Sequence, residues 1–256
     1  MHGKFIVTLV IAAALVMWPL AAGAPAADAS LAAATSGPDA AAPTVGALFT
    51  VSDGKLGTHF CTASVVDSPA GDMLVTAAHC LTGYSLTDPA GIVFVPGYDQ
   101  GATPYGVWTV TRAFVDAAWA ASSSSVNDDV AFLTVAPSAA GVTLESVTGA
   151  EELGTGQPAG QVVRVTGYPD SSDEPLSCRN YATAFSSTQL EFDCASYTDG
   201  TSGSPFLVRG DTSGRPDVVI GVIGGYEQGG NTPEVSYSAV FGPSVAALYA
   251  TAVAAA

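Results

Sequence analysis

Residues 76–80 of this 256-residue chain read TAAHC and contain His79, one of only three histidines. Further along, residues 127–133 read NDDVAFL and residues 200–205 read GTSGSP, with Ser202 at the centre. In chain order the three segments supply an imidazole, a pair of carboxylates and a hydroxyl. A base, an acid and a hydroxyl nucleophile in this order match one of the known orders of a catalytic triad. The three segments are therefore the candidate site.

These residue types suit nucleophilic catalysis. A serine hydroxyl such as that of Ser202 attacks only after a neighbouring base has removed its proton. Imidazole as a chemical group accepts and releases protons near neutral pH, which makes a histidine such as His79 suited to that task. A buried carboxylate behind the ring holds the correct tautomer and stabilises the imidazolium that forms. Asp128 and Asp129 both remain candidates for the acid at this point.

The glycines around Ser202 indicate a tight turn. Gly200 and Gly203 can adopt backbone conformations that are barred to other residues. Such a turn lets the N–H groups of Gly200 and Ser202 point at one spot, where a tetrahedral oxyanion would form. The segment therefore predicts a nucleophile and an oxyanion hole in the same loop.

Short segments rich in β-branched residues follow one another from Thr44 onward, with turn signals between them. We expect strands over residues 45–51, 60–66, 73–76, 91–95, 107–114 and 130–135, and then over 161–168, 181–185, 190–194, 205–208, 218–224 and 236–240. About twelve short strands at this spacing favour an all-β barrel or sandwich over βαβ units. The Ala-rich residues 244–254 follow Pro243 and favour a helix.

The N-terminal residues have the pattern of an export signal. Lys4 precedes an uncharged apolar run over residues 5–20, and small residues follow at 21–26. This is the arrangement of a secretory signal peptide, so we assign residues 1–26 to one and expect a secreted, extracellular protein. An uncleaved membrane anchor is the alternative, and it is disfavoured because a membrane span needs about 20 residues.

Composition divides the remaining chain. Residues 27–43 are Ala-rich without apolar periodicity, which favours a flexible pro-segment or linker. Residues 44–256 have the strand pattern of one domain. The Gly-, Ala-, Pro- and Glu-rich residues 136–160 are the best candidate for a join between its two halves.

The charge balance excludes several classes of function. The chain has 7 Lys and Arg against 23 Asp and Glu, a net charge of −16. A nucleic-acid binder needs a basic surface, and an anionic membrane would repel this protein. The 48% hydrophobic content excludes a disordered chain. We expect a monomer without a cofactor, because acidic excess favours solubility and no nucleotide-binding glycine pattern is present.

Four cysteines remain in the exported part of the chain. An even number in an exported protein predicts two disulfides, for which three pairings exist. We favour the two local ones, Cys61–Cys80 and Cys178–Cys194, which close loops of about 15–20 residues. A zinc site formed by Cys61, His79 and Cys80 is the alternative. It is disfavoured because the short ligand spacings that hold zinc are missing.

Residues 59–61, 76–80, 129–133 and 200–205 together resemble the chymotrypsin/trypsin-like serine proteases, in particular the secreted bacterial members. The resemblance covers residues 44–256. It implies two six-stranded antiparallel β-barrels with a C-terminal helix. It also implies a serine endopeptidase that cleaves protein or peptide substrates through an acyl-enzyme intermediate. A catalytically silent relative that serves as a binding or surface protein is the alternative.

The resemblance places the parts of the site. It divides the domain into a first barrel over residues 44–145 and a second barrel with the helix over 146–256. The acid of the family directly precedes an apolar strand, which favours Asp129 over Asp128. His79 and Asp129 would then come from the first barrel and Ser202 from the second.

Two further family features are expected near the site. The pair Cys61–Cys80 matches a disulfide of the family that pins the histidine loop. His59 resembles a buried histidine of the family, whose role is a hydrogen bond near the oxyanion loop rather than proton transfer.

One family feature is missing. The residue before the nucleophile, usually Asp, is Thr201. Residues 43–46 align with the activated N-terminus, and no Lys or Arg directly precedes them. In the family that Asp receives the new terminal ammonium. Because an unpaired buried charge is costly, the joint loss of both groups is consistent. We expect the oxyanion loop to be ordered without a buried ammonium.

The substrate-binding residues also depart from the family. Ser196 occupies the position six residues before the nucleophile, where trypsin has Asp. The usual Ser-Trp-Gly strand that pairs with substrate reads Gly224, Gly225 and Tyr226. A trypsin-like preference therefore does not transfer.

Three other residues near the pocket bear on its preference. Ile223 takes the place of a histidine that glutamyl endopeptidases of this fold use, so a Glu preference is not expected. Asp199 and Glu234 lie near the pocket by alignment and could attract a basic side chain, although ordinary surface carboxylates are the favoured interpretation.

Overall fold

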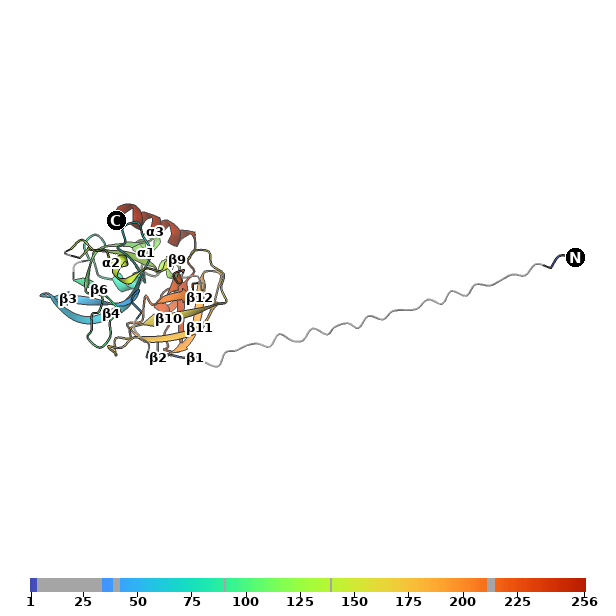
Figure 1. The fold of residues 1–256 in the computed structure, drawn as a ribbon, viewed down its shortest axis with the longest axis horizontal. Helices are drawn as coiled ribbons and strands as arrows, with labels where there is room; N and C mark the ends of the chain where they lie inside the picture. Colours follow the sequence, from blue (N-terminus) through green and yellow to red (C-terminus); the bar gives the residue numbers. More distant parts are fainter. Residues whose placement is uncertain (4–33, 39–41, 90, 139, 211–214) are drawn as a thin grey trace. The chain divides into compact units, whose positions relative to one another are not determined.

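The first half of the domain closes into a six-stranded antiparallel barrel. The computed structural model describes residues 1–3, 34–38, 42–89, 91–138, 140–210 and 215–256. The barrel is closed in the order β3-β4-β5-β8-β7-β6 (Figure 1). Its strands are β3 (Val45–Ser52), β4 (Lys55–Val65), β5 (Met73–Thr76), β6 (Ile92–Pro96), β7 (Trp108–Val115) and β8 (Ala131–Val135).

The second half forms a second barrel-like sheet. Its strands are β10 (Gln161–Gly167), β11 (Leu176–Ala184), β12 (Gln189–Ala195), β13 (Pro205–Val208), β14 (Val218–Val222) and β15 (Val235–Ala239). They pair in the order β15-β12-β11-β10-β13-β14. The N–H of Gly224 then donates to the carbonyl of Tyr237 at 2.9 Å, which brings the two ends of the sheet together without a regular ladder. The all-β, chymotrypsin-like fold class is thus confirmed.

Three two-residue strands extend the second sheet. β1 (Ala34–Thr35) runs parallel to β12, β2 (Gly37–Pro38) is antiparallel to β11, and β9 (Glu152–Leu153) is parallel to β14. Residues 34–38 therefore differ from the flexible linker expected over 27–43. Extended backbone pairs with a free strand edge through its own N–H and C=O groups, so no side-chain pattern predicts this pairing. The rest of that segment and residues 4–26 of the expected signal peptide lie outside the described residues.

The chain ends in a helix that returns to the first barrel. α3 (Pro243–Ala255) has Pro at its start, a favourable first position, and buries Val245, Leu248 and Ala252 on one face. The ring of Tyr249 lies 5.4 Å from that of Phe132 in β8. Arg112 in β7 donates to the carbonyl of Ala255 at 2.6 Å. The last helix therefore covers strands of the opposite half.

The remaining helical elements are short. They are α1 (Ala117–Ala121), α2 (Leu144–Thr148) and the 3-10 turns η1 (Ala78–Leu81), η2 (Val126–Asp128) and η3 (Tyr226–Gly229). Within the described ranges, no helix has the length and apolar character needed to cross a membrane. The 3-10 turns matter most for function, because η1 carries His79 and η2 ends directly before Asp129.

Candidate active site

One buried carboxylate holds both the backbone and the ring of His79. The backbone N–H of His79 donates to Oδ1 of Asp129 at 2.8 Å, and Nδ1 of the ring lies 2.8 Å from Oδ2. Asp129 is 1% exposed, whereas the His79 side chain is 12% exposed. With Nδ1 directed at a carboxylate it carries the proton, so Nε2 is the acceptor on the opposite side of the ring.

A third donor completes the surroundings of Asp129. The N–H of Gly225 donates to Oδ2 at 2.8 Å. A side chain at Gly224 would place its Cβ 3.1 Å from the same oxygen and 3.1 Å from Cβ of Ala77. Burial of an unpaired carboxylate is costly, and these three donors offset that cost. Gly224 and Gly225, expected to pair with substrate, therefore cover the acid.

Asp128 lies outside this arrangement. Its Oδ2 accepts a hydrogen bond from Ser125 at 2.5 Å within the same turn. The structure thus brings Asp129, and not its neighbour, to the imidazole.

The loop that carries Ser202 is tied to both barrels. The carbonyl of Ser202 accepts the N–H of Thr62 in β4 at 2.7 Å, and the N–H of Gly203 donates to the carbonyl of Ile223 at 2.7 Å. Gly203 has a φ of +83°, and an added Cβ would lie 2.1 Å from the carbonyl oxygen of Thr62. Only glycine fits this close approach of the two halves.

Two N–H groups of this loop are unused. Gly200 has a φ of +90°, and a Cβ there would lie 2.4 Å from the backbone nitrogen of Asp170. Among the described residues, the N–H groups of Gly200 and Ser202 donate to no protein acceptor, whereas the N–H of Thr201 donates to the carbonyl of Thr198 at 3.1 Å. Unpaired donors beside a nucleophile are suited to stabilising an oxyanion.

His79 and Ser202 line the same cleft, which has a volume of about 520 Å³. A second hollow of about 250 Å³ opens beside Ser202 and is lined by Ile223 and by the segment around Asn231, among others. Asp199 lines both hollows. In the described part of the chain, neither lining contains a Lys or Arg.

Two expected substrate-binding residues lie elsewhere. Ser196 is exposed, has a φ of +77° and is not among the described residues that line either hollow; the lining starts at Tyr197. The positive φ turns the chain at Ser196. Tyr226 is 37% exposed, with its ring 5.0 Å from Phe185 and 5.1 Å from Tyr237. It belongs to an exposed aromatic cluster.

Thr201, the residue before Ser202, forms its hydrogen bonds within its own loop. Thr201 is 2% exposed, and its hydroxyl donates to the carbonyl of Thr198 at 2.6 Å. At the start of the domain, the hydroxyl of Thr44 donates to Oε1 of Glu151 at 2.5 Å instead. Both contacts agree with an oxyanion loop that is ordered without a terminal ammonium.

Gln189 is a residue of the site that sequence reasoning missed. It is 3% exposed, and its Oε1 accepts the N–H of Tyr226 at 2.9 Å. Its Nε2 donates to the carbonyl of Val126 at 3.1 Å and to Oδ1 of Asn127 at 2.9 Å. Gln189 thereby links the turn before Asp129 to the glycines that cover it. Its partners are far away in the sequence, so no local signal marks it.

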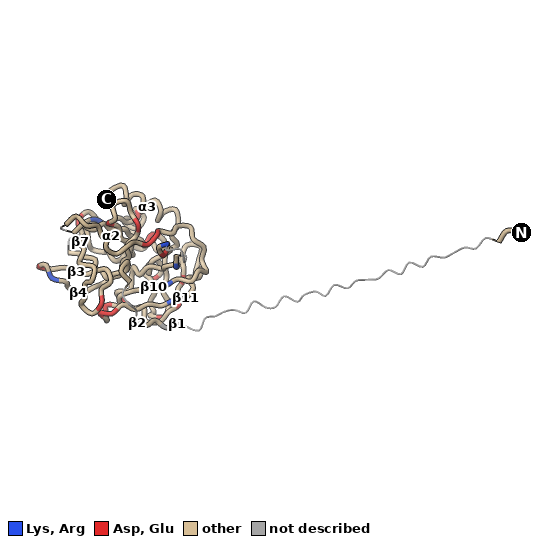
Figure 2. The backbone as a smooth tube through the Cα atoms, viewed as in Figure 1, with Lys and Arg blue, Asp and Glu red and all other residues tan. Residues whose placement is uncertain are grey.

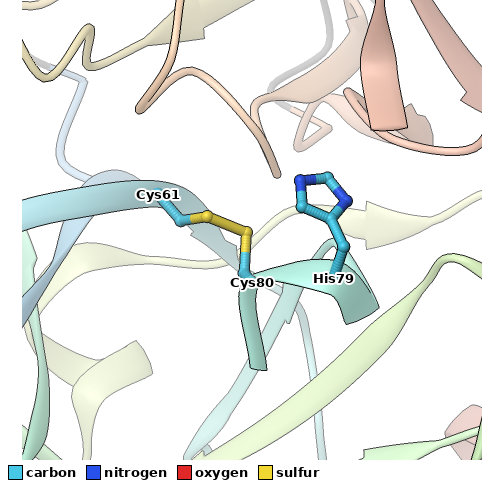
Figure 3. Close-up of side chains that lie close together, drawn as sticks. All are labelled: Cys61, His79 and Cys80. Carbon is cyan, nitrogen blue, oxygen red and sulfur yellow. A yellow bond between two sulfur atoms is a disulfide. The ribbon is translucent and has the colours of Figure 1, made fainter. Parts of the chain in front are cut away.

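The first disulfide supports the histidine turn. Cys61 of β4 is bonded to Cys80 of η1, and Figure 3 shows the ring of His79 beside this disulfide. Although an imidazole and two sulfurs lie within 4.8 Å of one another, each sulfur is bonded to the other. Neither is the thiolate that zinc requires. The second disulfide joins Cys178 of β11 to Cys194 of β12, the other favoured pairing.

His59 lies apart from the cleft. It is 6% exposed, its ring is 5.4 Å from that of Phe49, and its Nε2 lies 3.9 Å from Oδ1 of Asp173. Burial lowers the pKa of this imidazole, and the Asp173 carboxylate partly opposes the shift. Its Nδ1 is buried without a hydrogen-bond partner among the described residues, so these contacts indicate a packing role and the expected hydrogen bond near the oxyanion loop is not observed from this atom.

Comparisons with known proteins agree with this geometry. The family model described as Trypsin matches residues 35–242. Among solved structures, the protease Anisep from Arthrobacter nicotinovorans is similar, at 24% identity and a TM-score of 0.69, with 86% of this chain and 100% of that chain covered. The thermostable serine protease AL20 from an extremophilic microorganism is 27% identical, with a TM-score of 0.67 and coverage of 83% and 98%.

A Glu endopeptidase is similar in fold alone. It is 14% identical, with a TM-score of 0.62 and coverage of 86% of this chain and 97% of that one. The search of curated proteins finds no match.

Proposed function

The chain belongs to the trypsin family of serine proteases, and from this membership we propose that it is a secreted endopeptidase whose triad is His79, Asp129 and Ser202. One observation carries the proposal. The carboxylate of Asp129 fixes the imidazole of His79 from behind, while His79 and Ser202 line one cleft.

The proposed mechanism follows from these positions. Nε2 of His79 takes the proton of Ser202 as Oγ attacks the carbonyl carbon of the scissile peptide. The N–H groups of Gly200 and Ser202 stabilise the resulting oxyanion. His79 then donates its proton to the leaving amine, which departs and leaves an acyl-enzyme. Water, deprotonated by His79, attacks the ester carbonyl. The bond between the acyl carbon and Oγ then breaks, the carboxylic acid product leaves, and His79 returns the proton to Oγ of Ser202.

Asp129 acts through His79 in every step. It stabilises the imidazolium that exists between the two proton transfers and keeps Nδ1 protonated. Because Oδ1 of Asp129 also accepts the backbone N–H of His79, one carboxylate fixes both the ring and the main chain of His79.

Secretion is the second part of the proposal. The pattern of residues 1–26 is that of a signal peptide. The two disulfides support it, because such bonds persist in oxidising compartments outside the cytosol. Mass spectrometry of the protein from the culture medium would identify its first residue; retention of the whole protein in the cell would contradict this part.

Covalent labelling tests the catalytic part. A fluorophosphonate probe should label the purified protein at Ser202, and Ser202→Ala should abolish both labelling and peptide hydrolysis while the circular dichroism spectrum stays unchanged. Ser123→Ala, an exposed change outside the cleft, serves as the control. Wild-type hydrolysis by Ser202→Ala would end the proposal. Absence of labelling in the wild type would favour the silent binding protein.

A further inference from the structure

Three arginines of this acidic chain gather at one place. Arg164, Arg179 and Arg209 line a hollow of about 390 Å³ on the second sheet. The whole chain has only 7 Lys and Arg and a net charge of −16. Figure 2 shows blue positions beside β10 and β11, well away from the blue position on the β3–β4 hairpin. Three of the seven basic residues are therefore concentrated in this arginine cluster.

Strand register places the three side chains on one face. Arg164 in β10 is directly opposite Arg179 in β11, and on its other side it is opposite Leu207 in β13. Directly opposite residues of an antiparallel pair share a face. Arg209 follows Leu207 by two positions, so it continues on that face. The cluster thus crosses three neighbouring strands.

Only one of the three charges is neutralised. Nη2 of Arg164 lies 3.1 Å from Oδ2 of Asp217, and the other oxygen of Asp217 accepts the N–H of Gly210 at 3.0 Å. Both oxygens of that carboxylate are therefore in use. Within the described ranges, neither Arg179 nor Arg209 has an ion-pair partner, and both are exposed. Like charges directly opposite in a sheet are destabilising. Asp217 is the one carboxylate among the described lining residues, so two of the three positive charges are left for a further anion.

The geometry points to a tetrahedral oxyanion as that missing partner, and we propose that the arginine cluster binds a phosphate or sulfate group. A guanidinium presents two parallel N–H donors that match two oxygens of such a group. Arg164 is held in place by Asp217 and by a 3.3 Å hydrogen bond to the hydroxyl of Thr166. It forms the fixed wall of the site, and Arg179 and Arg209 close on the ligand.

The arginine cluster is separate from the candidate active site. None of its lining residues also lines the cleft or the hollow beside Ser202. Binding there is therefore independent of catalysis and of the triad assignment. The group would come either from a free ion or from a polymer that carries it, such as a sulfated or phosphorylated glycan.

Thermal unfolding measures this binding directly. The full chain with Ser202→Ala, which prevents self-digestion, is unfolded with sodium phosphate or with sodium chloride at equal ionic strength. A ligand that binds only the folded state raises Tm with saturation, here by about 2–6 °C. A parallel arm compares dextran sulfate with neutral dextran. A rise with phosphate indicates a free ion, and a rise with dextran sulfate alone indicates a polymer-borne group.

Variants make the test specific. The variants Arg179→Gln and Arg209→Gln, singly and together, should lose most of the rise in Tm. The control Lys55→Gln, which removes an exposed cation on β4, should keep the full rise. Arg179→Lys keeps the positive charge but loses the two parallel N–H donors of the guanidinium, so it should retain only part of the rise in Tm. Because sulfate and phosphate also stabilise proteins generally, an equal rise in the Arg179→Gln and Arg209→Gln variants would overturn the proposal. So would no saturable rise with any of the anions.

Discussion

Asp129 accepts hydrogen bonds from the main chain and from the ring of the same residue, His79, with 2.8 Å to each carboxylate oxygen. The two bonds fix the position and the rotation of the imidazole at once. The acid itself is positioned by Gly225 from the second half of the domain. The proposed base is therefore aligned by a contact between the two halves.

Asp129→Asn should lower kcat by about 10³–10⁴-fold with a much smaller effect on KM, because the amide favours the wrong tautomer of His79. Steady-state kinetics on a peptide substrate measures both constants. Asp128→Asn is the matched control, since Asp128 bonds only to Ser125 in its own turn. A similar loss in both variants, or none in Asp129→Asn, would contradict the assignment.

Gly203→Ala should destabilise the fold more than an equivalent change at an open turn. Gly156 has a φ of +69° and nothing within 4 Å of an added Cβ. Gly156→Ala should therefore lower the free energy of unfolding only by the strain of alanine in the left-handed region, about 1–2 kcal/mol. At Gly203 the overlap with Thr62 adds about 1–3 kcal/mol. Urea unfolding of both variants measures the difference between their free energies of unfolding. Equal midpoints would show that the loop moves aside without cost.

Stability should depend on pH through Glu151. Burial raises the pKa of this carboxyl to about 7 from an ordinary value of 4.5. The unfolded chain therefore ionises first, and this group's contribution to stability is fully present below pH 4.5 and lost as pH rises to about 7. The total is on the order of 3 kcal/mol.

Glu151→Gln isolates that contribution. In a Ser202→Ala background, the variant should gain stability relative to its parent between pH 5 and about 7.5, as measured by urea midpoints. Glu152→Gln, at the exposed neighbour, should follow its parent at every pH. If the gain of Glu151→Gln is the same at both ends of the range, the carboxyl does not titrate there.

The carboxylates of the cleft should set a charge preference. Asp199 lines both hollows and Glu227 lines the cleft. Peptides with Lys before the cleaved bond should therefore have higher kcat/KM than those with Gln, and those with Glu the lowest, by about 3–10-fold per step in low salt.

Asp199→Asn should lower the ratio of kcat/KM for the Lys peptide to kcat/KM for the Glu peptide. Glu234→Gln is the control, because Glu234 is not among the described residues lining either hollow. An unchanged ratio in Asp199→Asn, or the fastest cleavage after Glu, would contradict this preference.

The twelve main strands could be predicted from the sequence because buried strands carry their own pattern. The strand over 73–76 is observed with the predicted bounds, as is the one over 205–208. Where the pattern is polar, the bounds were missed. β11 starts at Leu176 rather than 181, because pairing with β10 extends the strand through residues 177, 179 and 180, which are polar.

The site divides in the same way. Short segments with a recognisable sequence contain His79, Asp129 and Ser202, so these residues could be predicted. By contrast, the linking role of Gln189 arises only when distant turns meet. Ser196 shows the limit of counting positions from the nucleophile, because one residue with positive φ redirects the chain. A second observed contact, Thr44 to Glu151, joins residues 107 positions apart and has no local signature.

The helix that returns to the first barrel has a consequence for biosynthesis. A growing polypeptide emerges N-terminal end first, so the strands around Phe132 are synthesised long before Tyr249, whose hydroxyl also donates to the carbonyl of Asp67 at 2.5 Å. The half that is made first therefore receives this covering from residues that are made later. A nascent or truncated product without α3 lacks that covering.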